Sequence, residues 1–400
     1  MVKSFVAALV ALTVMLTSTA YADFSQIGQF GTPANNPSAE ETSAEIIAAT
    51  EDGMTLVYSD SPANVLGMID ITDPTNPLPL GSVDLGGEPT SVAIKNGNAY
   101  VGINTSSDFV EPSGHLVVID IKTQMEVARF DLGGQPDSVA VSPDGTFVAV
   151  AIENERNEDI NDEMIPQLPG GYVAIVDLEK GTVTKADLVG YSVIAPNDPE
   201  PEFVDINNLG ETVVTMQENN WMAVIDRNGK VVSQFDAGMV TLVGVDNVKD
   251  GELNMVNTIE NVRREPDAVK WIDDDHFATA NEGDYKHKAP GQAKRGGSRG
   301  WTIFHKDGTV VYESGASYER AIASAGYWPE KRAEKKGVEP ESVEVATYGD
   351  TRYIFVGAER ANAIGVYNTN DLTNPQLVAI LATGIGPEGL VAITNRNLFV

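Results

Sequence analysis

The 400-residue sequence contains no cysteine, so neither disulfides nor thiolate metal sites can stabilise it. Histidine is scarce too, and His115, His276, His287 and His305 do not follow the spacing of a zinc motif. The Gly-x-Ser-x-Gly and His-Glu-x-x-His signatures of hydrolases are also missing. Stability must therefore come from a buried core or from a bound metal, and zinc is not the metal that this sequence favours.

Basic residues are few, with 27 Lys and Arg against 58 Asp and Glu and a net charge of −31. Nucleic acids and anionic lipid surfaces are bound through basic surfaces, so this balance argues against both as partners. The acidic excess favours solubility and divalent cations. For the net charge alone, an acidic coat suited to a saline habitat is the simpler explanation.

Long apolar runs are absent beyond residue 22, so we expect no transmembrane helix. The N-terminal run Phe5–Leu16 is too short to span a bilayer, follows Lys3, and leads to a small-residue cleavage site at 20–22. We interpret residues 1–22 as a signal peptide and Asp23 as the start of the mature chain. The protein is then secreted, periplasmic or at the cell surface, and we expect a monomer.

One motif recurs along the chain, a proline followed by an acidic residue and a short apolar strand. It occurs at 87–92, 134–139, 199–204, 264–269, 338–343 and 386–390, with a weaker first copy at 43–47. Each copy opens a unit of four short strands, expected in the second unit at 91–94, 99–103, 115–121 and 126–132. Repeats of about 45 residues with four strands each predict an all-β, seven-bladed β-propeller of four-stranded blades. A β-sandwich would not repeat one motif before every fourth strand.

The seventh unit stops at Val400, inside its second strand. A segment such as 24–30 would supply one missing outer strand but hardly both. We therefore expect a single propeller domain over residues 23–400 with an incomplete last blade, truncated at the C-terminus from a longer protein.

Acidic residues gather at the two strand ends that share one face of the propeller. The first strand of a blade runs along the channel and the second returns, so the start of one and the end of the other meet. The starts carry Glu88, Asp137, Glu200, Glu202, Glu265, Asp267, Glu339, Glu341 and Glu388, and the ends carry Asp60, Asn104, Glu153, Glu218, Glu282 and Glu359. Glutamate favours neither turns nor strands, so this ring indicates another role. Hard oxygen ligands from converging blades suit Ca²⁺; alternatively, each glutamate pairs with an arginine of its own or a neighbouring blade.

Four insertions fall on the same face, at 154–170, 283–300, 238–263 and 313–338. Two of them are basic and carry Lys286, Lys288, Lys294, Arg295 and Arg299, and Lys331, Arg332, Lys335 and Lys336. An acidic, metal-binding mouth bordered by basic loops suits an anionic ligand such as a phosphate ester. Alternatively, the basic loops only offset the acidic surface.

The motifs at 134–145, 151–156, 199–206, 280–284 and 386–390 resemble a family of secreted bacterial propellers. These are the phytase-like ("esterase-like activity of phytase") and choice-of-anchor I types, and the resemblance covers most of residues 44–400. It implies a propeller whose acidic central face binds Ca²⁺ and hydrolyses phosphate esters. The motifs are specific for the family but not for a reaction.

Two functions follow from these observations. The first is a Ca²⁺-dependent phosphoesterase with Glu153, Glu218, Glu282 and Glu359 as metal ligands, Asp137, Asp267 and Glu341 as bases or second ligands, and Arg156, Arg299 and Arg360 on the phosphate. The second is a non-catalytic surface or periplasmic propeller that binds a protein or glycan partner through the same loops.

Overall fold

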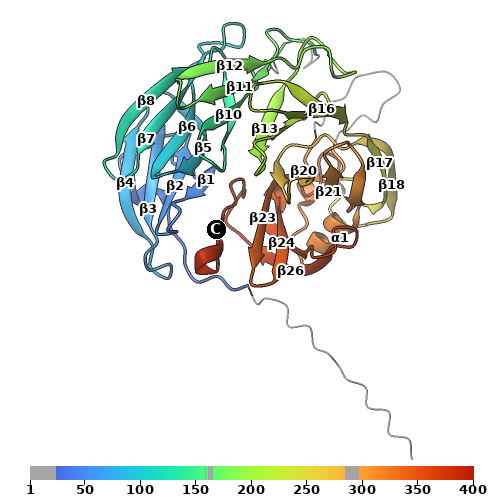
Figure 1. The fold of residues 1–400 in the computed structure, drawn as a ribbon. Coiled ribbons are helices and arrows are strands. Elements are labelled where there is room, and N and C mark those ends of the chain that lie inside the picture. Colours follow the sequence, from blue (N-terminus) through green and yellow to red (C-terminus); the bar gives the residue numbers. More distant parts are fainter. Residues whose placement is uncertain (1–23, 158, 161–164, 284–296) are drawn as a thin grey trace, which may run out of the picture.

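The computed structural model describes residues 24–157, 159–160, 165–283 and 297–400, which form a ring of antiparallel blades around a common centre (Figure 1). The chain runs once around the ring, from blue at the N-terminus to red at the C-terminus. The predicted signal peptide lies outside the described residues. Among those that are described, no helix is both long enough and apolar enough to cross a bilayer.

Six four-stranded sheets make up the described part of the ring. The first three blades are β1–β4 (Ile47–Ala49, Thr55–Asp60, Val65–Asp70, Leu78–Asp84), β5–β8 (Glu88–Lys95, Asn98–Asn104, Gly114–Asp120, Met125–Asp131) and β9–β12 (Pro136–Val141, Phe147–Ile152, Tyr172–Asp177, Thr182–Ala186). The other three are β13–β16 (Pro201–Ile206, Thr212–Met216, Trp221–Ile225, Val231–Asp236), β19–β22 (Val269–Trp271, His276–Asn281, Gly300–His305, Val310–Glu313) and β23–β26 (Pro340–Tyr348, Thr351–Ala358, Ala363–Asn368, Gln376–Ala382). The predicted four-stranded repeat is thus confirmed.

The second and third strands of each blade are buried on both faces, whereas the fourth is largely exposed, as in β2 and β3 against β4. Apolar side chains of neighbouring blades meet between the sheets; one such cluster joins blades three and four through Phe147, Val204 and Trp221. The serine of the repeat motif adds a polar link. Ser91 Oγ accepts the backbone N–H of Val139 at 3.1 Å, and Ser138 Oγ accepts that of Val204 at 3.3 Å. The motif therefore recurs because it joins successive inner strands.

The prediction of seven blades was wrong, because the described residues form six four-stranded blades. The seventh motif copy leads into a two-stranded hairpin, β27 (Ala392–Ile393) and β28 (Leu398–Phe399), and not into a four-stranded sheet. Residues 383–400 supply only this hairpin and a 3₁₀ turn, η5 (Thr394–Arg396), after β26. The hairpin lies between blade six and blade one, where the ring closes (Figure 1).

The β27–β28 hairpin makes contacts with both blade one and blade six. On the side of blade one, the Arg396 guanidinium donates to the carbonyl oxygens of Gly53, Ile71 and Thr72 at 2.8, 2.7 and 3.0 Å. On the side of blade six, the Phe399 ring stacks on Phe355 with centroids 4.0 Å apart. The hairpin thus bridges the first and last blades.

Replacing Arg396 with methionine should lower the free energy of unfolding by about 1–2 kcal/mol, because three carbonyl acceptors at the closure lose a charged donor. Urea denaturation followed by tryptophan fluorescence measures this change. Arg129→Met is the control, since Arg129 pairs with the exposed Glu126 of its own strand β8. Equal effects of the two substitutions would show that Arg396 does not hold the ring closed.

Two of the predicted insertion loops are partly regular. Residues 238–263 form a hairpin, β17 (Met239–Val245) with β18 (Asn257–Arg263), and residues 313–338 contain α1 (Ser317–Ser324) and a 3₁₀ turn, η3 (Glu330–Arg332). Two further 3₁₀ turns are η1 (Thr32–Ala34) and η4 (Glu359–Ala361). Tyr318 and Ile322 of α1 pack into the cluster between blades five and six.

Candidate cation site at the mouth of the channel

The proline of the repeat motif divides the acidic residues into two groups with different surroundings. The residue after the proline begins or precedes the inner strand of each blade. At this position stand Asp137, Glu202, Asp267, Glu341 and Glu388, with Thr90 in blade two, and Glu45 is the aligned residue of the first copy, where Ala44 replaces the proline. The charge of Asp137 in blade three raises the pKa of Asp267 in blade five, so the two carboxylates face the same channel mouth. We call these six carboxyl groups the mouth ring.

The members of the mouth ring are poor acids for two reasons. Burial is the larger cause and raises the pKa of Asp137 and of Glu388 to about 7 each, and that of Glu341 to about 11. Repulsion by neighbouring carboxylates adds to burial, and together they hold the pKa of Glu202 and of Asp267 well above the ordinary range. These raised pKa values mean that the ring favours a bound proton or another cation over bare carboxylates.

Three carboxylates come closest to one another. Oxygen atoms of Asp267, Glu282 and Glu341 all lie within 4.8 Å of one another, the one such metal-competent group among the described residues. Asp267 precedes β19, Glu282 follows β20, and Glu341 lies in β23, so blades five and six meet here. The backbone N–H of Asp267 donates to the Ala280 carbonyl at 2.9 Å, which sets Asp267 beside the end of β20. We call this group the carboxylate trio.

The trio has both basic and acidic neighbours. Lys336 Nζ lies 2.6 Å from Glu282 Oε1, and the amide of Gln217 donates to the other oxygen of Glu282. The carboxylate of Glu359 helps to raise the pKa of Glu341, and Glu359 itself lies 2.8 Å from Arg360. The trio is therefore partly, not fully, neutralised by protein cations.

The acidic residues before the proline behave differently. Glu200, Glu265 and Glu339 are almost fully buried and pair with Arg156 at 2.5 Å, Arg263 at 3.3 Å and Arg332 at 2.6 Å. For these three glutamates the alternative of arginine pairing holds. The equivalent Glu88 in blade two is exposed and accepts the side-chain amide of Asn104 at 3.1 Å.

The remaining predicted positions at the ends of second strands do not form one ring. Asp60 accepts backbone N–H groups of Ser43 and Ala63, and Glu218 pairs with Arg156. Glu153 lies near Asp137: burial, and then the charge of Asp137, raise the pKa of Glu153 well above the ordinary range. Of the four predicted metal ligands, only Glu282 belongs to the trio.

The three arginines predicted to hold phosphate lie in different places. Arg156 is buried and contacts Asp198 at 3.2 Å as well as two glutamates. Arg299 is 1% exposed, and its guanidinium donates to three backbone carbonyls. The Arg360 side chain is 48% exposed. Among these three, only Arg360 presents its guanidinium at the mouth.

The basic loops contribute unequally to the mouth. Lys286, Lys288, Lys294 and Arg295 lie outside the described residues. Arg332 pairs with Glu339, and Lys336 lies within reach of both Glu282 and Glu339. Sequence reasoning did not identify Glu45, although aligning 43–47 with the other motif copies places it at the post-proline position.

The comparisons place the chain among known proteins. A family model described as "Choice-of-anchor I domain" matches residues 45–195 and 287–372. Of the two types that the sequence motifs resemble, the match is to this one, and the phytase-like type remains a proposal. No curated protein matches the sequence.

Solved structures share the overall fold at low sequence identity. Hydrazine synthase of Kuenenia stuttgartiensis is 15% identical, with 89% of this chain and 94% of that chain covered and a TM-score of 0.52. Virginiamycin B lyase from Staphylococcus aureus is 12% identical, with 87% and 88% covered and a TM-score of 0.53. At such identities the likeness shows the propeller fold alone.

Proposed function

The chain belongs to the choice-of-anchor I domain family, and from this we propose that it is a secreted or cell-surface β-propeller that binds Ca²⁺ at the channel mouth and hydrolyses phosphate esters there. The observation that carries the proposal is the carboxylate trio of Asp267, Glu282 and Glu341. Its three oxygen ligands come from two blades and are half-buried.

The chemistry of the trio favours calcium over other cations. Ca²⁺ takes roughly six to eight oxygen ligands in flexible geometry, so three carboxylates would leave positions for water and substrate. No histidine or cysteine joins the trio in the described chain, and such ligands would favour zinc. A cation here would also relieve the repulsion that raises the pKa of Asp267 and Glu341.

Protein groups around the trio fit phosphate-ester hydrolysis. A bound Ca²⁺ would polarise a phosphoryl oxygen and acidify a coordinated water. The pKa of Asp137, raised by burial to about 7, suits a general base near neutral pH. Arg360, whose side chain is 48% exposed, would hold a phosphate oxygen.

A second candidate function rests on the loops around the mouth. Exposed apolar side chains stand on loops after second strands or before inner strands, namely Phe109, Val110, Val193 and Ile385. Since Arg156 and Arg299 are engaged in buried contacts, the mouth offers fewer free cations than phosphate binding would use. A non-catalytic propeller that binds a protein or glycan partner here is therefore the alternative.

The binding step is tested by a calcium titration. At a hundredfold excess over Kd, Ca²⁺ should stabilise the folded protein by about 2.7 kcal/mol and raise Tm by several degrees.

Glu282→Gln removes one ligand charge and should weaken Ca²⁺ affinity at least tenfold in calorimetry. Glu126→Gln, on the exposed outer strand β8, is the matched control. Equal small shifts with Ca²⁺ and Mg²⁺, or equal effects of the two variants, would indicate surface screening and remove the calcium assignment.

The catalytic step needs its own test. A panel of chromogenic phosphate monoesters and diesters, assayed with Ca²⁺ and with a chelator, should show turnover that requires Ca²⁺ and falls in Glu282→Gln. Calcium binding without turnover on any ester would leave the partner-binding propeller as the function.

A further inference from the structure

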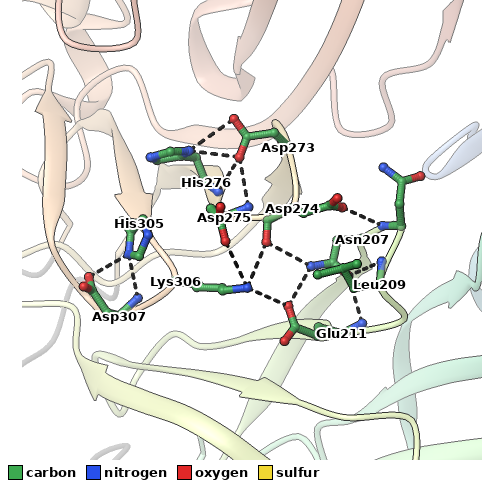
Figure 2. A network of polar contacts seen from close by, with 11 residues as sticks. Asn207, Leu209, Glu211, Asp273, Asp274, Asp275, His276, His305, Lys306 and Asp307 are labelled. Atoms are coloured by element: carbon green, nitrogen blue, oxygen red, sulfur yellow. Dashed lines mark hydrogen bonds and ion pairs between the residues drawn. The ribbon is translucent and has the colours of Figure 1, made fainter.

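Two histidines form a pair on the face opposite the mouth. His276 is the first residue of β20 and His305 the last of β21, and the two are direct cross-strand partners. Glu282 follows the other end of β20, about 20 Å away at roughly 3.3 Å per residue. The pair is therefore separate from the mouth ring; Figure 2 shows both histidines with their carboxylate neighbours.

Each imidazole is held by a neighbouring carboxylate through the same ring nitrogen. His276 Nδ1 lies 2.9 and 3.1 Å from the two oxygens of Asp273, and His305 Nδ1 lies 2.9 Å from Asp307 Oδ1. The Asp307 backbone N–H donates a hydrogen bond to the same nitrogen of His305, at 3.2 Å. A carboxylate only accepts hydrogen bonds, so Nδ1 of the neutral His276 ring carries the proton, and Nε2 of His276 keeps its lone pair, which is the arrangement of metal-bound histidines. His305 Nδ1 accepts the Asp307 N–H, so metal binding at its Nε2 would require the ring proton to move to Nδ1, where Asp307 Oδ1 lies 2.9 Å away to accept it.

The turn that carries Asp273 is fixed by an adjoining ionic network. Lys306 Nζ lies 3.0 Å from Asp275, 3.1 Å from Glu211 and 3.2 Å from the Asp274 carbonyl (Figure 2). The backbone N–H groups of Asp275 and His276 both donate to Asp273 Oδ1. Asp273 is thus set before any ligand arrives, and it sets the ring of His276.

We propose that His276 and His305 bind a transition-metal cation of the Zn²⁺ class through their Nε2 atoms. The ring centroids lie 5.2 Å apart, and the side chains are 26% and 34% exposed. A tetrahedral ion about 2.0–2.1 Å from each Nε2 sets two imidazole centroids about 5 Å apart, in agreement with this spacing. Water completes the coordination, and the acidic side chains around the pair favour a cation.

This site differs in chemistry from the carboxylate trio. Imidazole nitrogen suits zinc, copper and nickel, whereas Ca²⁺ and Mg²⁺ prefer oxygen. No linear zinc motif in the sequence indicates the pair, because the two histidines come from two strands that are joined by a long insertion. The antiparallel register of β20 and β21 brings them together.

The test is calorimetric titration of the metal-free full chain with Zn²⁺, with millimolar Ca²⁺ present to fill the trio. We expect one Zn²⁺ per chain in the unmodified protein and at least tenfold weaker binding in His276→Ala and in His305→Ala. His115→Gln is the matched control, because it removes a histidine of blade two that is not in the pair, and it should bind Zn²⁺ as before.

A spectroscopic readout covers the case in which a variant folds poorly. In ¹⁵N-labelled unmodified protein, Zn²⁺ should shift the Nε2 signals of His276 and His305 and leave that of His115 in place. Unshifted signals for the pair would overturn the assignment. So would Zn²⁺ binding that survives in both alanine variants or that Ca²⁺ displaces.

Discussion

Replacing Arg299 with methionine is expected to lower the free energy of unfolding by about 3–5 kcal/mol, because the substitution breaks a buried ionic network from one side. The guanidinium of Arg299 donates to the carbonyls of Asp246, Ala333 and Lys335 at 3.0, 2.8 and 2.7 Å. It also lies 3.4 Å from Glu319, which is fully buried. Burial raises the pKa of Glu319 to about 6, and the Arg299 charge limits that rise.

A double-mutant cycle tests whether the broken contact between Arg299 and Glu319 causes this loss of stability. Glu319→Gln should cost less than Arg299→Met, because Arg299 keeps its carbonyl acceptors, and the double variant should be more stable than the sum of the two losses implies. Urea denaturation monitored by circular dichroism measures all three variants. Arg360→Met, at the half-exposed rim, should stay within about 1 kcal/mol of the unmodified protein. A folded Arg299→Met protein of unchanged stability that has lost phosphate-ester affinity would restore Arg299 to the substrate site.

The contacts of Arg299 could not be predicted from the sequence. Its partners come from the β17–β18 insertion, from α1 and from the segment after η3, so no local spacing links them to Arg299. An arginine in a basic insertion was interpreted as a surface ligand for phosphate. The structure instead places it under 2% exposure with four acceptors.

The blades were predictable because their signals are local and repeated. Strands expected at 91–94, 99–103, 115–121 and 126–132 correspond to β5 to β8, since the short apolar runs and the Asn96-Gly97 turn are encoded within a few residues. The count of seven failed because a motif copy predicts where an inner strand begins, whereas a blade also needs residues for three more strands. The copy at 386–390 is followed only by the β27–β28 hairpin.

The sequence predicted which face of the propeller carries the candidate site, but not which residues contact one another there. The motif placed acidic residues at the mouth, and Asp267, Glu282 and Glu341 do meet there. The difference between Glu339, paired with Arg332, and Glu341, facing the mouth ring, depends on which side of the inner strand each occupies. A positive φ of 58° at Glu339 and a register shift between Pro340 and Ser342 set those sides. Such backbone irregularities leave little trace in composition.

Replacing Asp137 with asparagine is expected to stabilise the metal-free protein at pH 8 and to have little effect at pH 4. Burial, followed by the charge of Glu155, raises the pKa of Asp137 to about 7. An aspartate in the unfolded chain ionises near pH ~3.9. Below that pH both states are protonated. Between about pH 4 and 7 the folded state holds a proton that the unfolded state has released, so stability falls as pH rises by up to ~1.4 kcal/mol per pH unit. Above pH 7 the loss is complete, and asparagine avoids it.

The expected gain at pH 8 is about 2–4 kcal/mol, with the upper end set by the full pKa difference and the lower by solvent screening. Urea denaturation in a chelator at several pH values measures it. Asp144→Asn is the control, because the stability contribution of Asp144 is expected to depend on pH in the opposite direction. Hydrogen bonds from Thr146 and Ser142 lower the pKa of Asp144, so its stabilisation is present above pH 4 and is lost as pH falls. Adding Ca²⁺ should shrink or reverse the advantage of Asp137→Asn, because a bound cation neutralises the mouth. A pH-independent gain, or one that Ca²⁺ leaves unchanged, would mean that the mouth ring does not carry the charge repulsion assigned to it.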